Sequence, residues 1–203
     1  MKMGIFEIFV KGGLVMYPLL ICSILVAAIG IERMIYLRKM KTASPTFMTD
    51  LDARLKSGDL DGAKSLCQHT DGAVPALIAG GLTATTDKDK LEQVFESGAA
   101  IAASRLRYRV GMLDMIVTLS PLLGLLGTVI GMIQSFSVFN LKSGEPMAIT
   151  GGIGEALIAT ATGLCVAIFA LVVYTILNHK IDALIDQMEN AANAVILAAM
   201  ERK

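Results

Sequence analysis

Hydrophobic positions in this chain gather into three long stretches, over about residues 12–31, 113–139 and 152–178. Each stretch is long enough to cross a hydrocarbon core of about 30 Å as a helix. None shows the period-two alternation of a barrel strand, so helices are the structures that satisfy these backbone groups in lipid. We therefore predict an all-α integral membrane protein with three transmembrane helices.

Basic residues flank these stretches unevenly. Those next to the predicted membrane between the first and second stretches are Arg33, Arg38, Lys39, Lys41, Arg105, Arg107 and Arg109. The N-terminal tail has only Lys2 and Lys11, and the link before the third stretch has only Lys142. Because basic flanks stay on the cytoplasmic side, we expect the N-terminus to lie outside and the C-terminus to lie in the cytoplasm.

The expected organisation follows from the stretches and their flanks. In chain order it is an outer segment (1–11), a first span (12–36), a cytoplasmic helical region (37–111), a second span (112–139), an outer loop (140–151), a third span (152–178) and a cytoplasmic amphipathic helix (179–203). The first span is expected to be retained, because no clear small-x-small cleavage site follows it.

Turn and capping residues divide the cytoplasmic region into short helices. These starts and breaks are Ser44-Pro45, Gly58-Asp59, Asp71-Gly72 and Thr86. No strong breaker follows Thr86 until Pro121, so one unbroken helix is expected over residues 87–139.

The last span also has a predicted extension. Apolar residues recur there at three- and four-residue steps: Ile181, Leu184, Ile185, Met188, Ala192, Val195, Ile196 and Ala199. This stripe predicts that the second and third helices extend far into the cytoplasm and pack together. A membrane-surface helix is the alternative, although basic residues are scarce on its polar face.

Composition narrows the classes of function. The formal net charge is +0, which gives no electrostatic footprint for nucleic acid. Cys22, Cys67 and Cys165 fit no metal or disulfide spacing, and His69 and His179 stand alone. With no nucleophile–base pair or phosphate loop either, we expect neither an enzyme, nor a metal site, nor a bound cofactor.

Small residues mark one face of each of the last two spans. Gly124, Gly127 and Gly131 lie three and four positions apart in the second span. The third span has a similar face, formed by Ala156, Thr160, Gly163 and Ala167. Such faces let helices approach closely in a membrane, so we expect these glycines to serve helix packing.

Three polar side chains in the last two spans are candidate site residues. Thr128 and Thr160 fall near mid-membrane on or beside the small-residue faces, although a membrane threonine often bonds only its own helix. Glu155 lies about one turn inside the outer boundary, where an ionisable group is costly and normally faces a polar interior or a partner.

Two further residues have simpler expected roles. Asp114, near the cytoplasmic entrance, is expected to pair with Arg107 or Arg109, and Pro121 is expected to kink the second span. No Asp, Glu, His or Lys lies near mid-membrane. A proton relay needs such a group, so a partner would have to supply the titrating carboxylate.

The runs from Pro121 to Met132 and from Gly151 to Leu164, with Glu32-Arg33 at the end of the first helix, resemble the MotA/TolQ/ExbB proton-channel family, in its ExbB/TolQ branch. The resemblance implies a homopentameric channel whose pore holds a single-span ExbD/TolR-type partner that carries an essential aspartate. It further implies a proton-driven motor that energises outer-membrane transport through TonB, or a TolQ-like role in envelope maintenance. By motif position, Thr128 and Thr160 correspond to the hydroxyls that line the ion path, and Glu155 corresponds to the acidic residue of the third helix, so all three are expected to be pore-lining.

The chain also departs from that pattern. Phe169 stands where the family often has proline, and Thr175 follows Tyr174 where the family often has asparagine. The translocated ion would be H⁺ by family default, although hydroxyl-lined sites can also serve Na⁺. A small transporter and a passive membrane scaffold remain open as other functions, and both fit glycine-rich helices.

Overall fold

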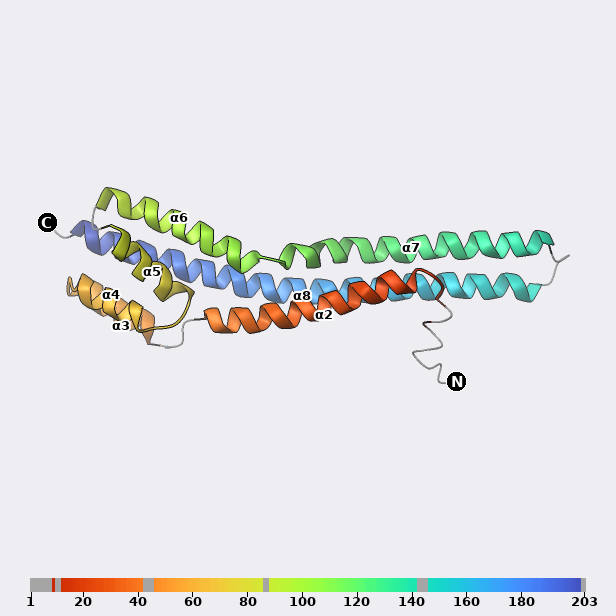
Figure 1. The fold of residues 1–203 in the computed structure, drawn as a ribbon, viewed down its shortest axis with the longest axis horizontal. Coiled ribbons are helices and arrows are strands. Elements are labelled where there is room, and N and C mark those ends of the chain that lie inside the picture. Colours follow the sequence, from red (N-terminus) through yellow and green to blue (C-terminus); the bar gives the residue numbers. More distant parts are fainter. Residues whose placement is uncertain (1–8, 10–11, 42–45, 86–87, 142–145, 202–203) are drawn as a thin grey trace. The chain divides into compact units, whose positions relative to one another are not determined.

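The computed structural model describes residues 9, 12–41, 46–85, 88–141 and 146–201, and Figure 1 traces them as helices joined by short turns. In chain order the helices are α2 (Met16–Met40), α3 (Phe47–Lys56), α4 (Leu60–Gln68), α5 (Ala73–Ala84), α6 (Lys88–Arg107), α7 (Val110–Leu141) and α8 (Pro146–Glu201). Three of them, α2, α7 and α8, are long and apolar enough to cross a membrane. The predicted all-α membrane protein with three such helices is confirmed.

The chain divides into two compact units. The first, which we call the apolar unit, comprises residues 1–31 and 109–175, and the second, the polar unit, comprises residues 32–108 and 176–203. Each unit therefore takes one part of α2 and one part of α8, while α7 belongs wholly to the apolar unit.

In the apolar unit, α7 lies beside the first part of α8 (Figure 1). Val15 and the first turn of α2 contribute a small core of Val15, Met16 and Leu19, against which Phe9, Leu123 and Ile130 pack. Helical structure reaches further into the expected outer loop than predicted, because α7 ends at Leu141 and α8 begins at Pro146. Proline suits the first position of a helix, where its missing N–H would have no partner.

In the polar unit, α3 packs on α4, α4 on α5 and α5 on α6. As the Gly58-Asp59 signal predicted, Asp59 caps α4, and its carboxylate accepts the Gly62 N–H at 2.8 Å. The caps expected at Ser44 and Thr86 lie outside the described residues. Much of the predicted C-terminal stripe is buried, at Ile181, Leu184, Met188, Ala192, Val195 and Ala199. Packing is therefore its role in this unit.

The unbroken helix expected over residues 87–139 is wrong. α6 ends at Arg107, α7 begins at Val110, and Arg109 has a left-handed φ of 65°. Within the polar unit, the Arg105 carbonyl accepts the Tyr108 N–H at 3.4 Å and Arg33 Nη1 at 3.5 Å. A helix that ends needs such partners for its last carbonyl groups, and Arg33 comes from another helix, so the local pattern of α6 did not reveal them.

Candidate functional site

The faces of α7 and α8 meet through glycine. A Cβ atom added to Gly124 would lie 3.0 Å from the Cα atom of Thr160. One added to Gly163 would lie 2.6 Å from the carbonyl oxygen of Ser120 and 3.0 Å from the Gly124 Cα atom. The obstructing atoms are backbone, which cannot swing aside, so the two helices are in direct main-chain contact here.

The same close approach continues along α7. A Cβ atom on Gly127 would lie 2.5 Å from the Ala159 Cβ atom, and one on Gly131 would lie 3.0 Å from the Ala156 Cβ atom. Ala156 and Ala159 are both buried. Gly124, Gly127, Gly131 and Gly163 therefore all face the contact between the two helices, which we call the α7–α8 seam.

Thr160 is the candidate hydroxyl that joins the two helices. It is half-buried, and its hydroxyl group donates to the Gly124 carbonyl oxygen at 3.0 Å, across the seam. The hydroxyl of Thr128 instead donates to the Leu125 carbonyl oxygen of its own helix at 2.6 Å. Thr160 thus lies in the seam. Thr128 lies at the edge of the seam and bonds only its own helix, as a membrane threonine often does.

Two serines in the seam were not among the predicted site residues. Ser120 is fully buried, and its hydroxyl oxygen has no hydrogen-bond partner within the described part of the chain. Ser135 is buried as well, donates to the Gly131 carbonyl oxygen at 2.8 Å and faces Gly152. Ser120 precedes Gly124 by four residues and Ser135 follows Gly131 by four, so helical spacing was the signal that pointed to both.

Glu155 lies three residues after Gly152 and four before Ala159, two seam positions of α8, so it borders the seam. It is five residues before Thr160, which corresponds to roughly 140° around a helix with 3.6 residues per turn. Its carboxylate oxygen Oε1 lies against Gly13, where an added Cβ atom would collide with it. The structure therefore does not bring Glu155 together with Thr160, and it places the carboxylate beside the turn that precedes α2.

The remaining predicted residues have surroundings of other kinds. Arg107 forms an ion pair with Asp182, at 3.1 Å, and the pairing expected for Asp114 with Arg107 or Arg109 stays a prediction. Pro121 lies inside α7, and the kink there stays a prediction. In the polar unit, burial raises the pKa of the Cys67 thiol to about 11. Over the described ranges, no group of three or more His, Cys, Asp and Glu side chains is arranged to hold a metal ion.

Known proteins resemble this chain over most of its length. The profile of the MotA/TolQ/ExbB proton channel family matches residues 69–190. The putative biopolymer transport protein ExbB-like 1 of Synechocystis sp. is 36% identical, over 83% of this chain and 68% of the relative. Biopolymer transport protein exbB1 of Vibrio cholerae is 29% identical over 91% of this chain and 84% of the relative. The Tol-Pal system protein TolQ of Haemophilus influenzae is 39% identical, but over only 39% of this chain and 35% of the relative.

Proposed function

The chain belongs to the MotA/TolQ/ExbB proton channel family, and on that premise we propose that it is the channel and stator subunit of a motor driven by the proton-motive force. In this proposal the chain is a homopentamer in the inner membrane, with its N-terminus outside and its C-terminus in the cytoplasm. The membrane lipids surround it, and a single-span ExbD/TolR-type partner occupies the central pore. The chain acts as a channel and not as an enzyme.

The observation that carries the proposal is the α7–α8 seam. A hydroxyl group, that of Thr160, crosses between two apolar helices there, and a buried serine hydroxyl lies one turn away along α7. Between Asp114 and Lys142, and again between Glu155 and His179, the sequence has no Asp, Glu, His, Lys or Arg, the side chains that normally serve a proton relay in a membrane. This chain then supplies polar walls, and the partner supplies the titrating carboxylate.

Each candidate residue has a role in this scheme. Thr160 retains acceptor capacity on its oxygen while its proton is donated to Gly124, so it can pass a hydrogen bond to water or to the partner. Thr128, at the edge of the seam, extends the polar path along α7. Glu155 provides the acidic group near the outer end, and Gly124, Gly127, Gly131 and Gly163 keep the helices close enough to form the seam.

We propose an ExbB-like role rather than a TolQ-like one, and a long alignment with an ExbB protein supports this choice. Alignment with the Vibrio cholerae exbB1 protein covers 91% of this chain, whereas alignment with the Haemophilus influenzae TolQ protein covers 39%. We therefore propose that the load is TonB-dependent transport across the outer membrane. Envelope maintenance of the Tol-Pal type is the second candidate, because TolQ matches this chain at 39% identity where the two align.

Proton flux tests the role of Thr160. The complex of this chain with its ExbD/TolR-type partner would be reconstituted in liposomes, and Thr160→Val compared with Thr162→Val. Thr162 is the matched control, because its hydroxyl donates to the Ile158 carbonyl oxygen of its own helix at 2.8 Å. We expect Thr160→Val to abolish flux and Thr162→Val to retain it. Wild-type flux from a normally assembled Thr160→Val complex would remove Thr160 from the ion path.

Subunit composition tests the assembly. Native mass spectrometry of the detergent-purified chain, alone and co-expressed with the partner, should give five copies that take up partner chains. A monomer or dimer that does not bind the partner would contradict the proposed pentameric pore. A scaffold or a small transporter would then be the better proposal. Complementation then separates the loads, since an ExbB-like protein restores TonB-dependent uptake and a TolQ-like protein restores detergent resistance.

A further inference from the structure

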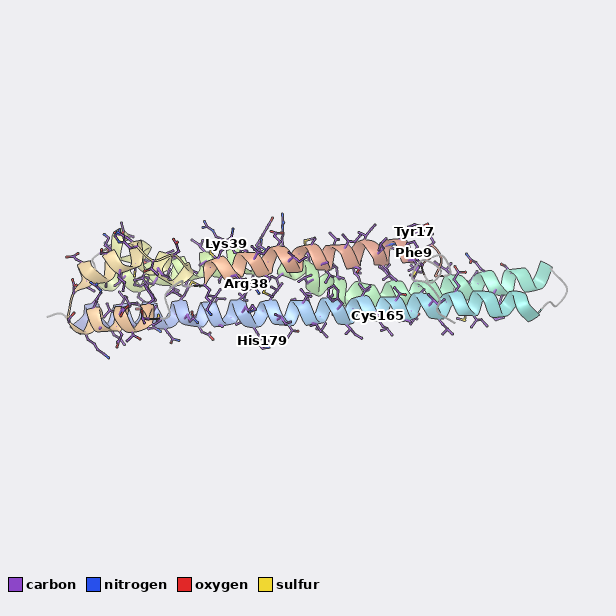
Figure 2. The ribbon with its side chains drawn as sticks, turned by 90° about the horizontal axis from the view of Figure 1, so that it is seen from below. Phe9, Tyr17, Arg38, Lys39, Cys165 and His179 are labelled. Carbon is purple, nitrogen blue, oxygen red and sulfur yellow. The ribbon has the colours of Figure 1, made fainter. Side chains whose placement is uncertain are left out.

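A double-glycine turn precedes α2 and is held in place from both sides. The Gly12 N–H donates to the Phe9 carbonyl oxygen at 3.4 Å, and the Met16 N–H donates to the Gly13 carbonyl oxygen at 3.2 Å. The rings of Phe9 and Tyr17 meet edge to face with centroids 5.3 Å apart, and Figure 2 shows them side by side at the start of α2. The turn is therefore a defined structure and not a loose end of the helix.

The next residues fix this turn to the α7–α8 seam. Val15 is buried, and its Cβ atom lies 3.6 Å from the position of a Cβ atom on Gly127. Gly12 faces Ile158 of α8, whose Cγ2 atom would lie 3.3 Å from an added Cβ atom. The turn thus touches both helices of the seam, on the stretch of α8 that contains Glu155.

Gly13 is the point where the turn meets Glu155. Its φ is 70°, a left-handed conformation that glycine adopts without strain. A side chain at this position would collide with the Glu155 carboxylate, so glycine leaves the space that the carboxylate fills. The start of α2 also directs the positive end of its helix dipole toward this side, and a negative group is favourable near a helix N-terminus.

We propose that Gly13 is a positioning residue that seats the Glu155 carboxylate at the outer end of the ion path. The inference rests on the proposed function for the role of Glu155 in ion flow. The seat fixes where the carboxylate lies and shields it on one side. The first span then contributes to the outer entrance of the ion path through Gly13, in addition to the two helices that form the seam.

The test needs a variant that fills the seat without straining the backbone. Gly13→Asn serves this purpose, since asparagine tolerates the left-handed conformation better than other residues with side chains. Gly12→Ala is the matched control in the same turn, because its Cβ atom would meet Met16 and Ile158 side-chain atoms and not the Glu155 carboxylate. Gly154→Ala is a second control, next to Glu155 in sequence, where an added Cβ atom meets nothing within 4 Å.

The first readout does not depend on activity. The full chain in complex with its partner would be treated with a carbodiimide, and modification of Glu155 followed by mass spectrometry. We expect Gly13→Asn to expel the carboxylate from its seat and to raise the labelling rate several-fold. Gly12→Ala and Gly154→Ala should be labelled at the wild-type rate. Equal labelling of Gly13→Asn and wild type would overturn the proposal.

The second readout is the pH profile of proton flux in liposomes. The pH profile should shift in Gly13→Asn and stay unchanged in both controls. Glu155→Asp, which shortens the acid by one methylene, should restore the wild-type profile when it is added to Gly13→Asn, and this rescue would confirm that the shift has a steric origin. If Gly13→Asn gives no folded protein, Glu155→Asp should restore its yield, and failure to do so counts against the seat. Normal flux in Glu155→Gln would instead overturn the role of Glu155 in the ion path. The labelling result would still test whether Gly13 positions the Glu155 carboxylate.

Discussion

The two units of this protein hold their helices together with different side chains. In the apolar unit, α7 and α8 meet through glycine and alanine, at Gly124, Gly127 and Gly163 and at Ala159. In the polar unit, helices meet through large apolar side chains; the fully buried ones include Phe47, Leu51, Ile78, Phe95, Leu106 and Met188.

We propose that lipid around the apolar unit and water around the polar unit cause this difference. Lipid is as apolar as leucine, so large side chains gain little by leaving it, and helices in a membrane associate by close packing and hydrogen bonds. In water, apolar burial itself stabilises the fold, by roughly 25 cal/mol per Å². Large buried side chains therefore stabilise the polar unit, whereas the α7–α8 contact of the apolar unit depends on small residues.

The largest expected effect is on a core aromatic of the polar unit. Phe95 is 2% exposed, and its ring lies against Gly81. Phe95→Ala should lower the free energy of unfolding by about 3–5 kcal/mol, measured by denaturant unfolding in detergent. Leu197→Ala is the control, since Leu197 is an exposed side chain in the same unit. Equal losses for the two variants would mean that burial does not govern this unit.

The next expected effect is slow alkylation of the Cys67 thiol. Its rate reports burial in the polar unit without a mutation in the core. Because burial raises the pKa of Cys67 from 9.0 to about 11, its thiolate fraction at pH 8 should be about 100-fold lower than that of an ordinary thiol. Alkylation would be compared with that of an exposed thiol introduced by Ser65→Cys in a Cys22→Ser, Cys165→Ser background. Rapid labelling of Cys67 would show that α4 does not stay packed.

A smaller loss of stability is expected in the apolar unit, and there it comes from adding an atom instead of removing a side chain. Gly163→Ala would force a Cβ atom against the Ser120 carbonyl oxygen, and overpacking of this type costs about 1–3 kcal/mol. Gly154→Ala, in open space on the same helix, should be neutral or slightly stabilising, because alanine is the better helix former. Thermal inactivation of the purified assembly measures both, and equal stability of the two variants would remove the role of glycine in the seam.

The smallest effect is expected at the surface of the polar unit. The Arg107–Asp182 ion pair has both side chains more than half exposed, at 61% and 54%. Arg107→Ala should change the free energy of unfolding by no more than about 1 kcal/mol, and high salt should reduce the difference further. A loss as large as that of Phe95→Ala would show that charge pairing, and not apolar burial, stabilises this unit.

Helical periodicity was sufficient to predict the seam from sequence. The spacing of Gly124, Gly127 and Gly131 placed them on one face of α7, and in the structure that face meets α8. The same spacing would have added Ser120 and Ser135, had it been followed one turn further in each direction. The sequence did not distinguish Thr128 from Thr160. In the structure, the orientation of each helix about its axis lets Thr160 bond across the seam, whereas Thr128 bonds within α7.

The sequence by itself determined the three membrane helices, the family and the small-residue faces, because each depends on composition or on spacing within one segment. Only the tertiary structure decided the break between α6 and α7 and the placement of Glu155 beside Gly13. Both depend on contacts between residues far apart in the chain, Arg33 with the Arg105 carbonyl oxygen and Glu155 with a turn before α2. Local periodicity gives the direction of a side chain around its own helix, but not which part of another helix will meet it.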